Sequence, residues 1–150
     1  MTTAEGAVPA LLTTKPTWLI SQVSARAHAV MAARLGTAGA RGYHVRVLAA
    51  LAEFGPASQA ALGRRVDMDR SDVTATITEL ADAGLVERAA DASDRRRNVI
   101  TLTDAGLARL HALDAILGGV QDEVLAPLSA DERSALVGLL TRALDGPDHG

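Results

Sequence analysis

The sequence predicts a mainly helical domain that carries one small β-hairpin. Apolar residues make up 48% of the chain but aromatic residues only 2%, so Ala, Leu and Val dominate, which favours helices. Apolar positions also recur at helical spacing through most of the 150 residues. The exception is the stretch 85–102, where two short alternating runs flank a basic loop, a pattern typical of a hairpin. The length fits a single domain, residues 1–150, with a substantial core.

The composition excludes several classes of protein. The chain contains no cysteine, which excludes disulfides, thiolate metal sites and cysteine-based redox sensing. Its four histidines are scattered without metal-ligand spacing, and no paired carboxylates, nucleophile–base arrangement or phosphate-binding glycine loop is present. We therefore expect no enzymatic activity, no metal and no cofactor. No run of about eighteen apolar residues and no signal-peptide pattern occurs, so we expect a cytoplasmic protein without a membrane span.

The first 54 residues predict a tail and two helices. Residues 1–16 contain turn-forming residues without periodicity, so we expect a loose tail. Thr17 is a suitable N-cap for a first helix that starts at Trp18. A second helix is predicted over residues 43–53. It is expected to end before Pro56, because proline cannot continue a helix.

The next stretch predicts a helix-turn-helix. Ser58 caps a short helix over residues 59–66, and Asp69 caps a longer one over residues 70–83. The longer helix has a narrow apolar stripe and a small, polar opposite face, and Gly84 provides the left-handed residue that ends it. A helix with such a polar face can lie in the major groove of DNA. The apolar stripe consists of Val73, Ile77 and Leu80.

A predicted β-hairpin follows the helix pair directly. Its strands are expected over residues 85–89 and 98–102, and the loop between them presents three consecutive arginines, Arg95–Arg97. Asp94 stands two residues before Arg96 and can hold its guanidinium through a bidentate pair. The order helix pair, strand, basic loop, strand is that of a winged helix-turn-helix, in which loop arginines reach the minor groove.

Two further helices complete the prediction. Thr103 caps a long helix to about Glu123, and the pair Gly118-Gly119 marks a kink, a break or a close helix–helix approach within it. Ser129 and Glu132 form a capping box at the start of the last helix. That helix is expected to bury Leu136, Leu139, Leu140 and Leu144.

The helices at the two ends of the chain are too apolar to serve only the small core of the winged region. We therefore expect residues 17–54 and 104–145 to form a helical dimerisation region, and residues 55–103 to form the winged helix-turn-helix that binds DNA. A dimer suits this role because two recognition helices about 34–36 Å apart match successive major grooves on one face of a duplex.

Together these motifs resemble the MarR family of bacterial transcriptional regulators. The motifs that carry the resemblance are GLVER at 84–88, DRR at 94–96 and ITLTDAG at 100–106. The match covers about 58–106, and the helix order agrees across nearly the whole chain. The resemblance implies a homodimer that binds a near-palindromic DNA operator, usually as a repressor. It also implies release of the DNA when a small aromatic or phenolic effector binds.

The resemblance implies roles for individual residues. By matched position, Asp94 and Arg96 form the wing pair that places an arginine in the minor groove. The positions implied to face the major groove are Ser71, Asp72, Thr74, Ala75 and Thr78. The rest of the predicted DNA-binding set is Ser58, Gln59, Arg64, Arg65, Arg70, Arg88, Arg95 and Arg97. The predicted effector contacts are Trp18, His28, Tyr43, His44 and Arg46.

A second interpretation is a helical dimerisation or protein-interaction module that does not bind an operator. Residues 58–103 carry seven arginines against eight acidic residues, a balance of −1, and Asp72 lies on the predicted DNA face. The sequence leaves this alternative open. It also leaves open the effector, the operator, the regulated genes and the choice between repressor and activator.

Overall fold

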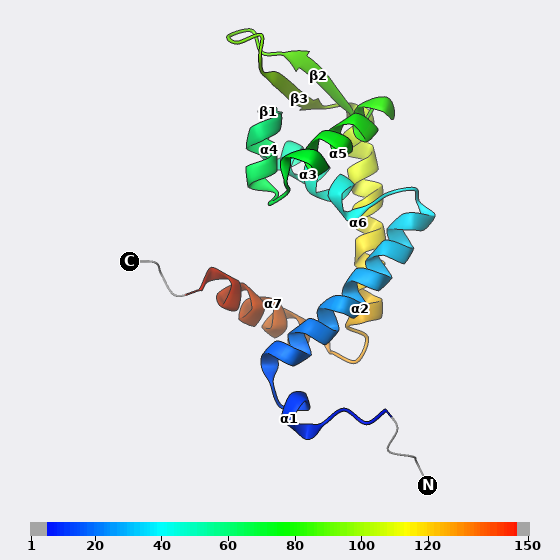
Figure 1. The fold of residues 1–150 in the computed structure, drawn as a ribbon. Helices are drawn as coiled ribbons and strands as arrows, with labels where there is room; N and C mark the ends of the chain where they lie inside the picture. Colours follow the sequence, from blue (N-terminus) through cyan, green and yellow to red (C-terminus); the bar gives the residue numbers. More distant parts are fainter. Residues whose placement is uncertain (1–5, 147–150) are drawn as a thin grey trace. The chain divides into compact units, whose positions relative to one another are not determined.

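The computed structural model describes residues 6–146, which fall into two compact units (Figure 1). We call Met31–Gly118 the winged unit, and the described residues before and after it, 6–30 with 119–146, the terminal unit. The long helices α2 (Pro16–Thr37) and α6 (Asp104–Val124) each contribute residues to both.

The compact winged unit is larger than residues 55–103, which were predicted to form the winged helix-turn-helix. It also includes helix α3 (Gly42–Phe54) and the first part of α6, and the dimerisation region predicted over residues 17–54 and 104–145 stays a prediction. The reason is packing, because Leu48 of α3 and Leu113 of α6 are fully buried in the same core as the helix-turn-helix.

The core of the winged unit lies between α3, α4 (Gln59–Arg65), α5 (Arg70–Asp82) and the sheet. The predicted apolar stripe of α5 is confirmed, because none of its three residues is more than 2% exposed. Burial of one face leaves the opposite face of α5 at the surface. The fully buried side chains of the core include Leu35, Val47, Leu48, Leu62, Val73, Ile77, Ile100 and Leu113.

Local sequence signals set the ends of the helix-turn-helix. Ser58 Oγ accepts the backbone N–H of Ala61 at 3.2 Å, and Asp69 Oδ1 accepts that of Asp72 at 2.9 Å. Both predicted N-caps are therefore confirmed, and each such cap typically contributes about 1 kcal/mol. Gly84 has a φ of 74°, the left-handed conformation predicted after α5.

The predicted hairpin is confirmed as part of a three-stranded antiparallel sheet of order β1-β3-β2. Strand β2 (Val86–Ala90) pairs with β3 (Asn98–Leu102), with Val86 opposite Leu102. The sequence missed β1 (Ala57–Ser58), which pairs with the other edge of β3. Two residues are too few to show the alternation by which a strand is predicted.

A tight junction joins the end of α5, the base of the hairpin and the start of α6. Thr103 caps α6 as predicted, since its hydroxyl accepts the Gly106 N–H at 3.0 Å, and the same hydroxyl donates to the Gly84 carbonyl at 2.8 Å. The Thr103 N–H donates to the Leu85 carbonyl at 3.2 Å. Gly106 packs against that carbonyl so closely that a Cβ would overlap it.

The N-terminal part of the chain departs from the prediction. Helix α2 begins at Pro16, so Thr17 lies within its first turn and the predicted cap is wrong. Proline suits the first position of a helix because it has no N–H to leave unpaired. Within the predicted loose tail 1–16, residues Ala10–Thr13 form the short helix α1, and residues 1–5 lie outside the described residues.

Helix α6 is continuous through Gly118-Gly119, so a break at this pair is excluded. Apart from the helix's own backbone, no atom of the described residues lies within 4 Å of where either Cβ would be, so neither glycine serves a close approach among these residues. The predicted capping box of α7 (Ala130–Asp145) is confirmed. Ser129 Oγ accepts the Glu132 N–H at 3.2 Å, and a Glu132 carboxylate oxygen accepts the Ser129 N–H at 2.9 Å.

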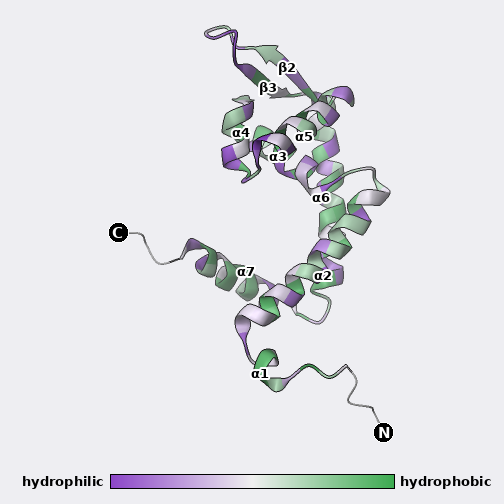
Figure 2. Ribbon diagram, in the orientation of Figure 1, coloured by the Kyte–Doolittle hydropathy of each residue, from purple (hydrophilic) through white to green (hydrophobic). Residues whose placement is uncertain are grey.

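The leucines of α7 are not buried within the chain, contrary to the prediction. Leu139 is 62% exposed and Leu144 is 87% exposed, whereas Leu136 is half-buried. Figure 2 shows that hydrophobic residues recur along this helix. Helix α2 carries a similar set of exposed apolar residues, Leu19, Ile20 and Val23. Among the described residues, no helix is both long enough and apolar enough to cross a membrane.

We predict that Gly106→Ala destabilises the winged unit by about 1–3 kcal/mol, because the new methyl group overlaps the Leu85 carbonyl and lies 2.6 Å from Leu102 Cδ1. Gly36→Ala is the matched control, since a Cβ at this helical position meets nothing within 4 Å. Urea unfolding measures both. Equal stability of Gly106→Ala and the wild type would contradict the close approach.

Candidate nucleic-acid interface

The outer face of α5 is exposed and free of bulky groups. Ser71, Thr74, Ala75 and Thr78 all lie on this face, as the resemblance implied. Asp72 does not belong to it. This residue is half-buried, and its carboxylate accepts a hydrogen bond from the Tyr43 hydroxyl of α3 at 3.3 Å. The acidic residue that counted against a DNA-binding face is thus turned toward the neighbouring helix.

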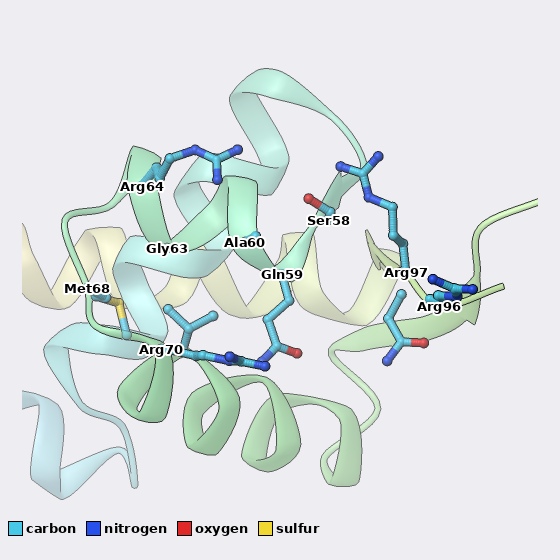
Figure 3. Close-up of a pocket in the computed structure, with 11 residues that line it drawn as sticks. Ser58, Gln59, Ala60, Gly63, Arg64, Met68, Arg70, Arg96 and Arg97 are labelled. Atoms are coloured by element: carbon cyan, nitrogen blue, oxygen red, sulfur yellow. The ribbon is translucent and has the colours of Figure 1, made fainter. Parts of the chain in front are cut away.

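A concave surface lies between α4, the start of α5 and the wing loop (Figure 3). The hollow that it lines has a volume of about 630 Å³. Arg64 and Arg70 line one side, and Arg96 and Arg97 line the other. The described residues that line it include no Asp or Glu. The remaining lining residues are Ser58, Gln59, Ala60, Gly63, Met68, Val73 and Asn98. The arrangement concentrates positive charge in a chain that is slightly acidic overall.

The wing loop is organised by its two aspartates. Asp94 Oδ1 accepts the backbone N–H of Arg96 at 3.0 Å. Among the described residues, the Asp94 carboxylate therefore stabilises a turn of the backbone and does not form the predicted pair with the Arg96 guanidinium. Asp91, which the sequence reading did not single out, accepts both the N–H and the hydroxyl of Ser93 at 2.9 and 2.8 Å. These two hydrogen bonds, with a smaller effect of Arg97, lower the pKa of the Asp91 carboxyl.

Two threonines on the outer face of α5 hold side chains from neighbouring elements. Gln59 Nε2 of α4 donates to Thr74 Oγ1 at 2.5 Å. Arg88 of β2 donates to Thr78 Oγ1 at 2.7 Å. The structure thus brings four residues of the predicted DNA-binding set together in two pairs, one turn of α5 apart.

The two consecutive arginines of α4 lie in different places. Arg64 lines the concave surface, as predicted for a phosphate contact. The Arg65 guanidinium lies over the ring of Phe54, 4.4 Å from its centroid. Phe54 is 55% exposed and was read from the sequence only as part of a helix stop. Its stacking holds Arg65 beside the end of α3.

Polar contacts tie the start of α3 to α5. Arg41 donates to both carboxylate oxygens of Glu79 at 2.8 and 2.7 Å, and His44 Nε2 lies 2.6 Å from Glu79 Oε2. His44 Nδ1 accepts the Arg41 N–H at 3.2 Å, which assigns the remaining ring proton to Nε2 as the donor to Glu79. The hydrogen bond from His44, followed by that from Arg41, lowers the pKa of Glu79. His44 was predicted from the sequence as an effector contact, whereas its partner Glu79 was not predicted.

A second cavity, of about 460 Å³, lies beside this cluster within the winged unit. His44, Glu79 and Arg109 give it a polar edge, and Arg109 also donates to the Ala38 carbonyl. The rest of its lining is largely apolar and consists of Gly39, Leu48, Leu80, Ala83, Leu85 and Leu113.

The five predicted effector contacts are not gathered in this cavity. His44 lines it, whereas Tyr43 reaches Asp72 and Arg46 lies over the Tyr43 ring, 5.7 Å from its centroid. Trp18 and His28 belong to the terminal unit. Arg109 was missed because a single arginine on a long helix carries no motif.

Comparison with known proteins agrees with this architecture. A model of the MarR family matches residues 36–97. The HTH-type transcriptional repressor NicR of Pseudomonas putida is 30% identical over 102 residues, which cover 68% of this chain and 65% of NicR. YdgJ, an HTH-type transcriptional regulator of Bacillus subtilis, is 33% identical over 85 residues, which cover 57% of this chain and 52% of YdgJ. The chain thus spans about half to two thirds of the length of these curated relatives.

Solved structures match over most of the chain. A probable transcriptional regulator from Pseudomonas aeruginosa is 34% identical with a TM-score of 0.75, covering 88% of this chain and 98% of that one. PcaV of Streptomyces coelicolor, in complex with its natural ligand, is 28% identical with a TM-score of 0.75. The match covers 93% of this chain and 97% of PcaV. A mutant MarR from E. coli complexed with operator DNA is 22% identical with a TM-score of 0.73. The match covers 91% of this chain and 99% of that MarR chain, and it supports the fold alone.

The helix pair with its sheet and basic loop defines a winged helix-turn-helix protein. Within that class, the family match and the relatives identify the chain as a member of the MarR family.

We predict that Glu79→Gln destabilises the protein at neutral pH, because the amide cannot replace the charged acceptor for Arg41 and His44. The folded pKa of Glu79 is lowered, so its contribution is present above the unfolded pKa and is lost as pH falls through the folded one. The stability difference between wild type and variant therefore shrinks toward acidic pH. Glu87→Gln on β2 is the exposed control. A pH-independent difference in urea unfolding would contradict this role.

Proposed function

We propose that this chain is a homodimeric transcriptional repressor that binds a two-fold symmetric DNA operator through its winged unit. The observation that carries the proposal is the concave surface, where four arginines face one another without an acidic neighbour in the lining. Cationic side chains spaced across such a surface suit successive phosphates of a duplex. A regulator that binds chromosomal DNA acts in the cytoplasm of a bacterium.

The roles of individual residues follow from their positions. The outer face of α5, with Ser71, Thr74, Ala75 and Thr78, is assigned to the major groove. Arg96 on the ordered wing loop is assigned to the minor groove, where a narrow groove attracts arginine. The residues assigned to the phosphate backbone are Ser58, Arg64, Arg70, Arg88, Arg95 and Arg97, whereas Gln59 lies beside them at the junction of α4 and α5.

The alternative of an interaction module without DNA binding rested on two observations. The first was Asp72, whose side chain accepts a hydrogen bond from Tyr43 and does not lie on the outer face of α5. The second was the −1 balance of residues 58–103, but the arginines there are concentrated around one concave surface. Screening limits the reach of the remaining acidic residues to about 8–10 Å, which favours DNA binding over the alternative.

A homodimer is supported by the exposed apolar residues of α7 and α2. Leu139 and Leu144 face solvent in the single chain, as do Ile20 and Val23 of α2. Apolar side chains exposed in such numbers mark interaction surfaces. A second copy of the chain would cover them and would place two winged units on one operator.

We further propose a small aromatic or phenolic effector. Relatives support this, since PcaV is described with a natural ligand and BpsR of Bordetella bronchiseptica with regulation of its DNA binding by 6-hydroxynicotinic acid. The second cavity offers leucine side chains for a ring and the polar groups of His44 and Arg109 at its edge. Trp18, His28, Tyr43 and Arg46 remain candidate contacts of the effector in the assembled dimer.

We predict that the wild-type chain shifts the intergenic DNA upstream of its gene at low salt, and that Arg96→Ala weakens this binding by about 1–3 kcal/mol. The loss is expected because Arg96 lines the concave surface from the wing. Arg142→Ala, on exposed α7, is the arginine control and should bind normally. Fluorescence anisotropy titrations give the affinities.

The absence of any shift by the wild type at low salt, where phosphate contacts are strongest, would contradict DNA binding. Unchanged affinity of Arg96→Ala would instead contradict the role of the wing alone.

We predict that the chain sediments as a dimer of twice 15.5 kDa at micromolar concentration, and that Leu139→Asp shifts it toward the monomer. An added charge at this exposed apolar position would be buried without a partner if a second copy covers α7. Ser134→Asp, also exposed on α7, is the matched control. A wild type that sediments as a monomer would contradict the proposed assembly.

A further inference from the structure

The side-chain amide of Gln59 is held at the junction of α4 and α5. Its Nε2 donates to Thr74 Oγ1 at 2.5 Å. The Thr74 hydroxyl gives its own proton to the Arg70 carbonyl at 2.8 Å, so an oxygen lone pair is left to accept from Gln59. The amide therefore has one orientation, with its nitrogen toward α5 and its oxygen turned away.

The unused half of the amide faces the concave surface. Figure 3 shows Gln59 reaching from α4 toward α5, with its amide oxygen on the side of Arg96 and Arg97. Among the described residues, neither this oxygen nor the second N–H of the amide has a protein partner. Gln59 thus presents one acceptor and one donor side by side at the surface proposed to bind DNA.

Adenine is the base whose major-groove edge complements such a pair. Its N7 accepts and its N6 amino group donates, whereas guanine offers two acceptors at the corresponding positions. We propose that Gln59 reads an adenine at one position of each operator half-site, and that Thr74 is the positioning residue that holds the Gln59 amide. The inference rests on the proposed DNA-binding function and adds a base specificity to it.

The surroundings of Gln59 separate its role from that of the arginines. Arg64, Arg70, Arg96 and Arg97 line the same surface and carry charge that attracts every DNA sequence equally. Gln59 is neutral, so it adds little to this general attraction. Its hydrogen bond to Thr74 fixes the amide before DNA binds, which reduces the rotamer entropy lost on binding and sharpens the choice of base.

The test is selection of bound duplexes from a random-sequence DNA library, followed by sequencing. The chains compared are the wild type, Gln59→Ala, Thr74→Val, Thr74→Ser and the double variant of Gln59→Ala with Thr74→Val. Arg64→Ala serves as the control for a phosphate contact, which is expected to weaken binding to all sequences alike. Affinity for a non-selected duplex checks that each variant still presents its charged surface.

The wild type should enrich a two-fold symmetric motif with an A·T pair that Gln59→Ala no longer selects. Discrimination at that position should fall by about 5- to 150-fold, the range typical of one bidentate base contact, with the other positions unchanged. Thr74→Val should weaken the same preference, and Thr74→Ser should retain it because the hydroxyl remains. On the Gln59→Ala background, Thr74→Val should cause no further loss at that position.

An unchanged motif with Gln59→Ala would overturn the inference. So would an equal loss of affinity for all sequences, because it would place Gln59 on a phosphate. Both results leave the proposed DNA-binding function standing. If the wild type enriches no motif, the proposed function and this inference fail together.

Discussion

The close approach of Gly106 to the Leu85 carbonyl is the constraint on which the geometry of the winged unit depends. At this point the end of α5, the residues just before β2 and the first turn of α6 meet, and Thr103 bonds to Gly84, Leu85 and Gly106. A side chain at position 106 would push the hairpin away from α6. Because the same junction ends α5, it sets the wing relative to the helix assigned to the major groove.

A second set of contacts holds α5 from the other side and lies beside a cavity. Tyr43 bonds to Asp72 near the start of α5, and Arg41 with His44 bonds to Glu79 two turns later. Since His44 and Glu79 also line the second cavity, a molecule bound there would touch the residues that hold α5. This arrangement supplies a short physical path from the proposed effector to the proposed DNA-binding helix.

Much of the fold could be predicted because its signals are local. Ser58, Asp69, Gly84 and Ser129 mark helix ends through their own hydrogen bonds or backbone conformation, and these predictions were confirmed. The candidate site was less predictable, because its pairs join residues far apart in sequence. Such partners are Gln59 with Thr74, Arg65 with Phe54, and His44 with Glu79. The burial predicted for α7 is not found within the single chain, because apolar periodicity does not tell whether a helix face packs inside its own chain or against another molecule.

Hydroxyl-radical footprinting of the chain on a duplex that it has selected would show whether two winged units bind one operator. We expect two protected regions related by two-fold symmetry, with centres about 10–10.5 base pairs or a multiple of that spacing apart. We also expect that Arg96→Ala removes protection only in the minor grooves beside those regions. A single unsymmetrical region, or protection unchanged by Arg96→Ala, would contradict binding by two winged units whose wings enter the minor groove.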